Sequence, residues 1–405
     1  MIIGVFTGCS SDDPLVDKVE EERSYLNGEI NTSIDFINAL ANSEISNINL
    51  TDDITLNSGN IQTINRDLTI DLRGNTLTQN DDIEVTAGNT LIITSVKDGA
   101  KLKGDGGITG DGEVVNEVEL EPVKAWTFSN HTSIVYDVAV DSDGNVYSGS
   151  QDNTVRKIDS GGNQVWSKDI NSTVWEVAVG SSGNFVYSGD SDSNVKKLDN
   201  NNSGAEEWTF TQHSYSVYGL VIDNNDFLYS AGSWDNTVRK IDSGGNQMWS
   251  KDIKSTVYDV AVGSNGDFIY SGDGDGNVKK LNSNNSGDEE WTINVGGSVN
   301  SVTVDSEGNV YSGSRDNTVK KIDSEGNQVW SFDGHTDPVE DVVVDSNGNV
   351  YSGSSDNTVK KIDSEGNQVW SFNLPDTVYD VAIDSEGNVY TANYGDNSVT
   401  KIKQE

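Results

Sequence analysis

The sequence has few of the residues from which disulfides, metal centres and membrane spans are built. Its 405 residues include one cysteine, four prolines and three histidines. A single cysteine excludes an internal disulfide, and three histidines spread along the chain argue against a zinc site or a catalytic triad. No stretch approaches the ~20 consecutive apolar residues that a membrane-spanning helix requires. We therefore predict no metal, no cofactor, no catalytic residue and no transmembrane span.

Positive charge is also scarce. The chain has 26 Lys and Arg against 66 Asp and Glu, a formal net charge of −40. The acids are spread along the whole sequence, so the field covers the surface and repels nucleic acid and anionic membranes. Molar salt screens such self-repulsion. We predict a halophilic source, with an acidic secreted protein from an ordinary habitat as the alternative.

A repeat of about forty residues dominates the second part of the chain. Seven tryptophans mark it, at intervals of 39 to 42 residues: Trp126, Trp166, Trp208, Trp249, Trp291, Trp330 and Trp370. Each unit contains short apolar strands separated by Gly, Asn and Asp turns. This period and this turn chemistry are typical of β-propeller blades with four strands each.

The sixth unit shows the four strands most clearly, at residues 339–345, 350–354, 358–363 and 368–372. The seventh unit, Val378 to Ile402, ends before its fourth strand. The segment Val123–Phe128 matches that missing strand and has no unit before it. We therefore predict an all-β fold, a seven-bladed β-propeller closed by an N-terminal strand.

The repeat resembles two propeller families. Ser352–Asp363 is similar to the core of a WD40 blade, with Ile362 where that family usually has Trp, and Gly334-His335 matches its Gly-His pair. Without that Trp, the hydrogen-bonded Asp-His-Ser-Trp set of the family is not expected in any blade. The Val-Tyr-Ser-Gly-Ser, Ile-Asp, Gly-Asn and Val-Trp phrases resemble quinoprotein (PQQ)-like repeats. Both resemblances imply the fold, and neither implies bound quinone.

Residues 30–118 are expected to form a smaller β-rich domain. Short strands are predicted at 48–50, 54–56, 68–72 and 91–93. The phrase Leu68–Leu77 resembles a rung of a right-handed β-helix, as in pectate-lyase-like adhesive domains. About four rungs fit, and a small β-sandwich is the alternative. Lyase activity is not implied. We therefore predict three parts: a signal-like segment and acidic tether at 1–29, the β-rich domain at 30–118, and the propeller at 119–405.

The single cysteine lies in a sequence that resembles a lipoprotein lipidation site. A small residue, Gly8, precedes Cys9, and polar and acidic residues follow it. The preceding apolar stretch is short and lacks a basic residue, so Cys9 is either a lipid anchor with the true start upstream or a coincidence.

The candidate binding site comes from comparing the units. The residue that begins the inner strand is aromatic in five of seven units, and in WD40-like rings this position surrounds the mouth of the central channel. The residue before the turn Asp lies nearby and varies most between units. Aromatic rims stack on sugars or seat a partner's side chains; the alternative is that they only plug the channel. The candidates are Tyr136, Trp175, Tyr218, Tyr258, Tyr379, Trp234 and Arg315.

Together these features indicate a non-catalytic surface protein of a halophile, anchored by lipid outside the cell and binding a glycan or a protein. The three histidines fit loop packing better than catalysis. One alternative is a virion spike or receptor-binding protein of a virus that infects halophiles. A quinoprotein-type enzyme is the third hypothesis, and the sequence has no ligand cluster for it.

Overall fold

The computed structural model describes residues 29–30, 47–50, 54–56, 62–64, 68–71, 76–79, 83–85, 90–94, 101–103, 108–109, 113–116, 122–180 and 182–404. The chain divides into two compact units, Met1–Glu121 with Glu405, and Pro122–Gln404. The predicted lipidation site at Cys9 lies outside the described residues.

The first unit contains three sheets of parallel strands, and the chain visits them in turn. When successive strands enter three sheets in turn and each pairs parallel with the strand one turn earlier, the chain forms a β-helix. A sandwich built of hairpins would have antiparallel pairs instead, so the predicted β-helix-like unit is confirmed. Ile70 is fully buried in it. The first sheet holds β1 (Glu29–Ile30), β2 (Asn47–Leu50), β5 (Leu68–Asp71), β8 (Thr90–Thr94) and β11 (Glu113–Asn116). The second holds β3 (Ile54–Leu56), β6 (Thr76–Gln79) and β9 (Lys101–Lys103), and the third β4 (Gln62–Ile64), β7 (Ile83–Val85) and β10 (Ile108–Thr109).

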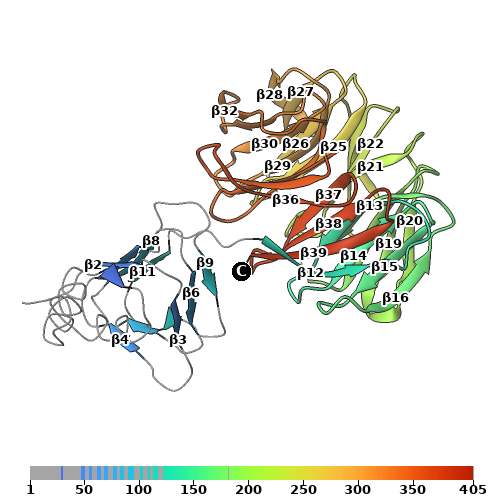
Figure 1. The fold of residues 1–405 in the computed structure, drawn as a ribbon. Helices are drawn as coiled ribbons and strands as arrows, with labels where there is room; N and C mark the ends of the chain where they lie inside the picture. Colours follow the sequence, from blue (N-terminus) through green and yellow to red (C-terminus); the bar gives the residue numbers. More distant parts are fainter. Residues whose placement is uncertain are drawn as a thin grey trace, which may run out of the picture. The chain divides into compact units, whose positions relative to one another are not determined.

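The second unit is a propeller of seven four-stranded antiparallel sheets (Figure 1). Blade one contains β13 (Val135–Val140), β14 (Val146–Ser150), β15 (Thr154–Ile158) and β16 (Gln164–Asp169). Blade two contains β17 (Val174–Val179), β18 (Phe185–Asp190), β19 (Val195–Asp199), the short 3-10 helix η1 (Asn200–Asn202) and β20 (Ala205–Phe210). Blade three contains β21 (Val217–Ile222), β22 (Leu228–Gly232), β23 (Thr237–Ile241) and β24 (Gln247–Asp252).

The remaining blades repeat this order. Blade four contains β25 (Val257–Val262), β26 (Phe268–Asp273), β27 (Asn277–Asn282) and β28 (Asp288–Asn294). Blade five contains β29 (Val299–Val304), β30 (Val310–Ser314), β31 (Val319–Ile322) and β32 (Gln328–Phe332). Blade six contains β33 (Val339–Val344), β34 (Val350–Ser354), β35 (Thr358–Ile362) and β36 (Gln368–Asn373). The four strands predicted for this unit are confirmed within one residue at each end.

Blade seven joins the two ends of the propeller sequence. It contains β37 (Val378–Ile383), β38 (Val389–Asn393) and β39 (Ser398–Gln404), and its fourth strand is β12 (Pro122–Phe128). In Figure 1 the teal β12 lies beside the red β39, and the two pair antiparallel from Pro122–Gln404 to Phe128–Val399. The predicted closure is confirmed, and it leaves no blade with an unpaired inner edge.

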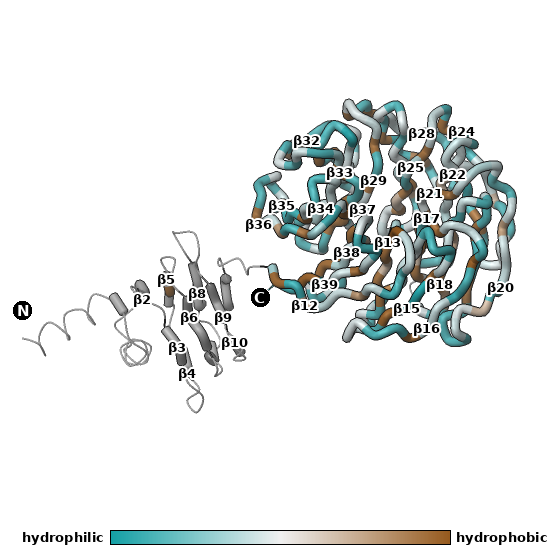
Figure 2. The backbone as a smooth tube through the Cα atoms, turned by 45° about the vertical axis from the view of Figure 1, so that its right-hand side comes forward, coloured by the Kyte–Doolittle hydropathy of each residue, from teal (hydrophilic) through white to brown (hydrophobic). Residues whose placement is uncertain are grey.

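Apolar residues alternate with polar ones along the strands of each blade (Figure 2). The second strand is buried along its whole length, as in Val146–Ser150, whereas the fourth strand is largely exposed, as in Gln164–Asp169. Buried side chains of neighbouring blades pack together, so the core is a ring of seven clusters between blades.

Six of the seven repeat tryptophans donate a hydrogen bond to the next blade. The centroid of each tryptophan ring lies 5.9–6.1 Å from the ring centroid of the buried tyrosine in the same blade, as for Trp126 and Tyr390. The Trp126 Nε1 donates to the carbonyl of Ser160 in the next blade, at 3.1 Å. Gly162, with φ +88°, faces this ring, and a Cβ there would lie 3.0 Å from it. The period of the sequence is therefore the period of the blade junctions.

Candidate functional site

A β-bulge in every inner strand creates the mouth of the central channel. In each blade the register shifts between the first and third residues of that strand, as between Val135 and Asp137. The extra residue is the one predicted to form the rim, for example Tyr136. Bulges release a residue from the ladder and redirect its side chain. The same local distortion therefore delivers seven side chains to one end of the channel.

Five of these side chains form a continuous arc of rings, here called the aromatic arc: Tyr379, Tyr136, Trp175, Tyr218 and Tyr258. Ring centroids lie 4.2 Å apart for Tyr136 and Trp175 and 5.0 Å apart for Trp175 and Tyr218. Tyr218 and Tyr258 are parallel within 7° at 6.1 Å, and Tyr379 meets Tyr136 at 5.4 Å. These rings are half-buried, so their remaining faces line the mouth.

Blades five and six complete the mouth with polar groups. The Arg315 guanidinium lies 5.6 Å from the centroid of the Tyr258 ring, and its Nε donates to Asn300 Oδ1 at 3.2 Å. The Asn300 amide nitrogen donates to Glu340 at 3.0 Å, and Ser355 donates to the same carboxylate at 2.6 Å. Mutual hydrogen bonds therefore hold this sector in place before any ligand arrives.

All seven predicted residues line one cavity of about 580 Å³ at the channel mouth. Trp234, at the turn between β22 and β23, is 70% exposed there, which is unusual for tryptophan. The structure adds Tyr394, which is 42% exposed and lies 5.4 Å from Tyr379. The sequence comparison missed Tyr394 because its position is aromatic only in blade seven.

Sequence reasoning also missed a ring of carboxylates behind the arc, here called the carboxylate ring: Asp137, Glu176, Asp259, Asp341 and Asp380. The signal was present, because the residue after the rim position is acidic in five of seven units. Each carboxylate accepts a backbone N–H from another blade, as Asp137 does from Val177 at 2.5 Å and Asp380 from Val138 at 2.9 Å. The ring therefore ties blades together around the channel.

The channel environment disfavours the charged form of these acids. Burial raises the pKa of Asp137 to about 8, partly offset by the Val177 N–H, with a further increase from the charge of Asp341. Burial raises the pKa of Asp259 to about 7 and the pKa of Glu176 and of Asp380 well above the usual range. Part of the ring therefore holds protons at neutral pH.

The histidines lie in their own blades, away from one another. His131 Nε2 accepts from Ser148 Oγ at 2.8 Å, and its Nδ1 donates to Asp152 at 2.9 Å, since a carboxylate only accepts. Burial lowers the pKa of His131 and keeps the ring neutral, whereas hydrogen bonds from His131 and Thr154 outweigh burial and lower the pKa of Asp152. Equivalent histidine networks are His213–Ser230–Asp235 and His335–Ser352–Asp356.

The four-member Asp-His-Ser-Trp set was not expected, because the Trp position is aliphatic. The other three residues nevertheless hydrogen-bond to one another in blades one, three and six. Loop packing is the role that the structure gives the histidines. In blades two, four and five an aliphatic residue stands at the histidine position, and the serine hydroxyls of Ser188, Ser271 and Ser312 have no partner among the described residues.

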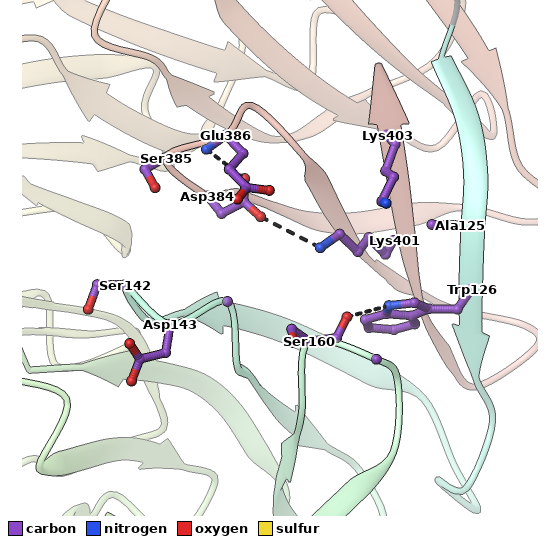
Figure 3. A pocket seen from close by; sticks show the side chains of 12 residues that line it. Ala125, Trp126, Ser142, Asp143, Ser160, Asp384, Ser385, Glu386, Lys401 and Lys403 are labelled. Atoms are coloured by element: carbon purple, nitrogen blue, oxygen red, sulfur yellow. Dashed lines mark hydrogen bonds and ion pairs between the residues drawn. The ribbon is translucent and has the colours of Figure 1, made fainter. Parts of the chain in front are cut away.

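A second cavity, of about 510 Å³, lies where blades seven and one meet (Figure 3). Lys401 Nζ approaches Asp384 at 3.7 Å across its wall, and the Trp126–Ser160 bond closes the other side. Its lining comes from β39, β12 and the hairpins beside them, at the one point where no hairpin joins the third and fourth strands of a blade. We attribute this cavity to ring closure.

Within the described part of the chain, no three His, Cys, Asp or Glu side chains are grouped closely enough to hold a metal ion. No helix in that part is long and apolar enough to cross a membrane.

The arrangement defines a seven-bladed β-propeller. The WD40 β-propeller domain of Doa1 superposes with a TM-score of 0.63 at 22% identity, covering 70% of this chain and 97% of that domain. Such identity establishes the fold alone. No curated protein matches the chain.

Two family profiles match the sequence. The chain belongs to the family described as "Putative pectate lyase-like adhesive domain", whose profile matches residues 28–258. This match covers the first unit and continues through three blades, where the structure is a propeller. Residues 234–346 match the family described as "Outer membrane protein assembly factor BamB", a PQQ-type repeat. Both resemblances predicted from the residues are confirmed.

Proposed function

We propose that this protein is a non-catalytic binding protein that recognises a glycan or protein partner at the channel mouth. The observation that carries the proposal is the convergence of all seven predicted residues on one cavity, two of them, Trp234 and Arg315, from the position that varies most between near-identical blades. Structural positions such as the junction tryptophans stay constant between blades. Variation on a concave, aromatic surface is characteristic of a binding site on a repeated scaffold.

Absence of catalysis is part of the proposal and rests on the histidines. All three are neutral, buried and hydrogen-bonded on both ring nitrogens within their own blades. Both nitrogens of each histidine are therefore engaged in hydrogen bonds within the blade, and none of the three side chains lines the cavity. The carboxylates behind the arc accept backbone N–H groups, which is also a structural role.

We further propose display outside the cell of a halophile. The net charge of −40 supports growth in molar salt, and the names of both matching families, an adhesive domain and an outer-membrane assembly factor, support an exported location. Lipidation at Cys9 is proposed as the anchor. An intact mass of the native protein tests it: a mature chain beginning at acylated Cys9 supports the anchor, and an unmodified Met1 contradicts it and favours the virion spike.

Binding is tested with cell envelopes of the source organism in molar salt. The wild-type protein is expected to sediment with envelopes, and the variant Trp175→Leu/Tyr379→Leu to lose most of this binding. Val329→Ala, which shortens an exposed residue of the outer strand of blade five, is the matched control and should bind like wild type. Equal binding of all three proteins would refute a role for the mouth.

A further inference from the structure

The channel mouth places aromatic rings directly in front of acids. In four blades the ring and the carboxylate are consecutive residues: Tyr136–Asp137, Trp175–Glu176, Tyr258–Asp259 and Tyr379–Asp380. The bulge separates their roles, since the ring lines the mouth and the carboxylate lies in the channel wall. Any group that passes the aromatic arc therefore meets the carboxylate ring next.

These carboxylates have no counter-charge. Within the described residues, no Lys, Arg or His lies within 4.0 Å of any of the five acids. They interact with one another instead: Asp380 is hydrogen-bonded to both Asp137 and Asp341, and Ser301 donates to Asp341 at 2.6 Å. The mouth thus contains five acids whose charge no basic side chain among the described residues balances.

Arg315 is the single cation that lines the cavity. It is held at the edge by the Tyr258 ring and Asn300, beside Glu340 rather than beside the carboxylate ring. Among the described residues that line the cavity, no Lys, Arg or His lies in the four blades in which a ring is followed by an acid. An entering cation would lie against aromatic faces, which attract cations through their quadrupole, and would supply the charge that the acids lack.

The chemistry favours an organic cation over a metal ion. Calcium requires six to eight oxygen ligands, and no three acidic side chains in the described part of the chain are grouped closely enough for a metal. An alkylammonium group needs no such coordination sphere. Its methylene stem contacts rings, and its charged head reaches carboxylates behind them.

We propose that the channel mouth binds the ammonium group of a lysine side chain presented by a protein partner. The stem would pass the aromatic arc, and the head would meet the carboxylate ring. Exposed Trp234 and Tyr394 would contact the partner surface around that lysine. The inference rests on the proposed function, because it assigns the ligand chemistry of the same mouth.

The test uses n-butylammonium chloride, which has the length of the lysine side chain, and 1-butanol as its neutral counterpart. Binding to the full-length protein is followed by tryptophan fluorescence at constant ionic strength. We expect n-butylammonium to bind about tenfold more tightly than 1-butanol. The affinity should rise from pH 6 to pH 9, because Asp259 and then Asp137 lose their protons over this range. The other carboxylic acids that line the mouth are Glu176, Asp341, Asp380 and Glu340, and its base is Arg315.

Two variants locate the site. Trp175→Leu removes a ring and should abolish the difference between the two probes. Asp259→Asn removes one charge at pH 9, keeps an acceptor for Val302 N–H, and should weaken n-butylammonium binding at that pH several-fold. Asp143→Asn removes the same charge from an exposed hairpin and should leave binding unchanged. Thermal unfolding confirms that each variant is folded.

The outcomes separate this inference from the proposed function. Equal affinity for the two probes would overturn the ammonium proposal. Loss of envelope binding in the arc variant, Trp175→Leu/Tyr379→Leu, would still support the proposal that the channel mouth is the binding site. Binding of an amine-bearing glycan, chitosan oligomers, in preference to a lysine-rich peptide would contradict the protein partner. If neither probe binds and the arc variant still binds envelopes, both proposals fail.

Discussion

The histidine networks and the carboxylate ring are both built from buried acids, yet they respond to pH in opposite directions. In the networks each Asp is ionised and receives hydrogen bonds from a neutral His and a Thr, which lower its pKa. In the ring, burial raises the pKa of each acid, and repulsion from neighbouring acids raises the pKa of Asp137 and of Asp380 further. The networks repeat in three blades to hold the structure, whereas the ring concentrates uncompensated acids at one point.

The largest expected effect comes from breaking a histidine network. His213→Ala leaves ionised Asp235 and the Ser230 hydroxyl buried without their partner, so the free energy of unfolding should fall by about 3 kcal/mol. Guanidinium titration in molar KCl measures it. The control is Ile253→Val at the equivalent position of blade four, which removes one methyl group and should cost about 1 kcal/mol. Equal costs would show that the network contributes nothing beyond packing.

The opposite pH responses predict a stability maximum on the acid side of neutral pH, between about 4 and 6.5. The pKa of each His is lowered by folding, so their contribution is present above the unfolded pKa of about 6.5 and is lost below it. The pKa of Asp137 is raised to about 8, so its contribution is complete below about 4 and is lost as pH rises to 8.

Asp137→Asn should therefore stabilise the protein at pH 9, by about 2 kcal/mol, and leave the acid side unchanged. Melting temperatures from pH 5 to 9 provide the measurement, with Asp143→Asn as the control for lost charge. A variant less stable than wild type at pH 9 would contradict the assignment of Asp137 as a protonated channel acid.

A smaller contrast lies within the blades. Ser230→Ala deprives His213 Nε2 of its donor and should cost about 1 kcal/mol. Ser271→Ala, at the equivalent position of blade four, removes a hydroxyl that has no partner in the part of the chain that the structure describes, and it should be neutral or slightly stabilising. The same denaturation experiment compares the two. An equal loss in both variants would mean that the hydroxyl of Ser271 is satisfied in solution.

The smallest effect on stability is expected at the rim. Trp234 is 70% exposed, so Trp234→Ala should change the free energy of unfolding by less than about 0.5 kcal/mol. Partner binding should nevertheless weaken, because the ring is part of the mouth. Envelope sedimentation and thermal unfolding of one preparation measure both quantities. Unchanged binding would remove Trp234 from the site.

The repeat made the propeller predictable. Near-identical units with a tryptophan every 39–42 residues specify blade number, strand order and closure, and the unmatched strand at Val123–Phe128 identified the closing partner. Rim positions followed from alignment of the units. The β-helix-like unit was predictable only in outline, since its short rungs carry a weaker repeat.

Other features required the fold. The acids of the carboxylate ring could be read from the aligned units, but their convergence depends on bulges in five inner strands, which the sequence does not show. The histidine networks join residues that are 17 to 22 positions apart, as in His213, Ser230 and Asp235. The absence of Trp predicted that the four-member set would not form, but the sequence alone did not show that the remaining three residues hydrogen-bond to one another.

The central claim is that the channel mouth is the binding site, and fluorine NMR tests it most directly. The nine tryptophans are the seven junction residues together with Trp175 and Trp234. In protein labelled with 5-fluorotryptophan, solubilised envelope partner should shift the resonances of Trp175 and Trp234, assigned by Leu and Ala variants, and leave the junction resonances in place. Shifts confined to junction tryptophans would show that the partner binds the blade sides and would contradict the account.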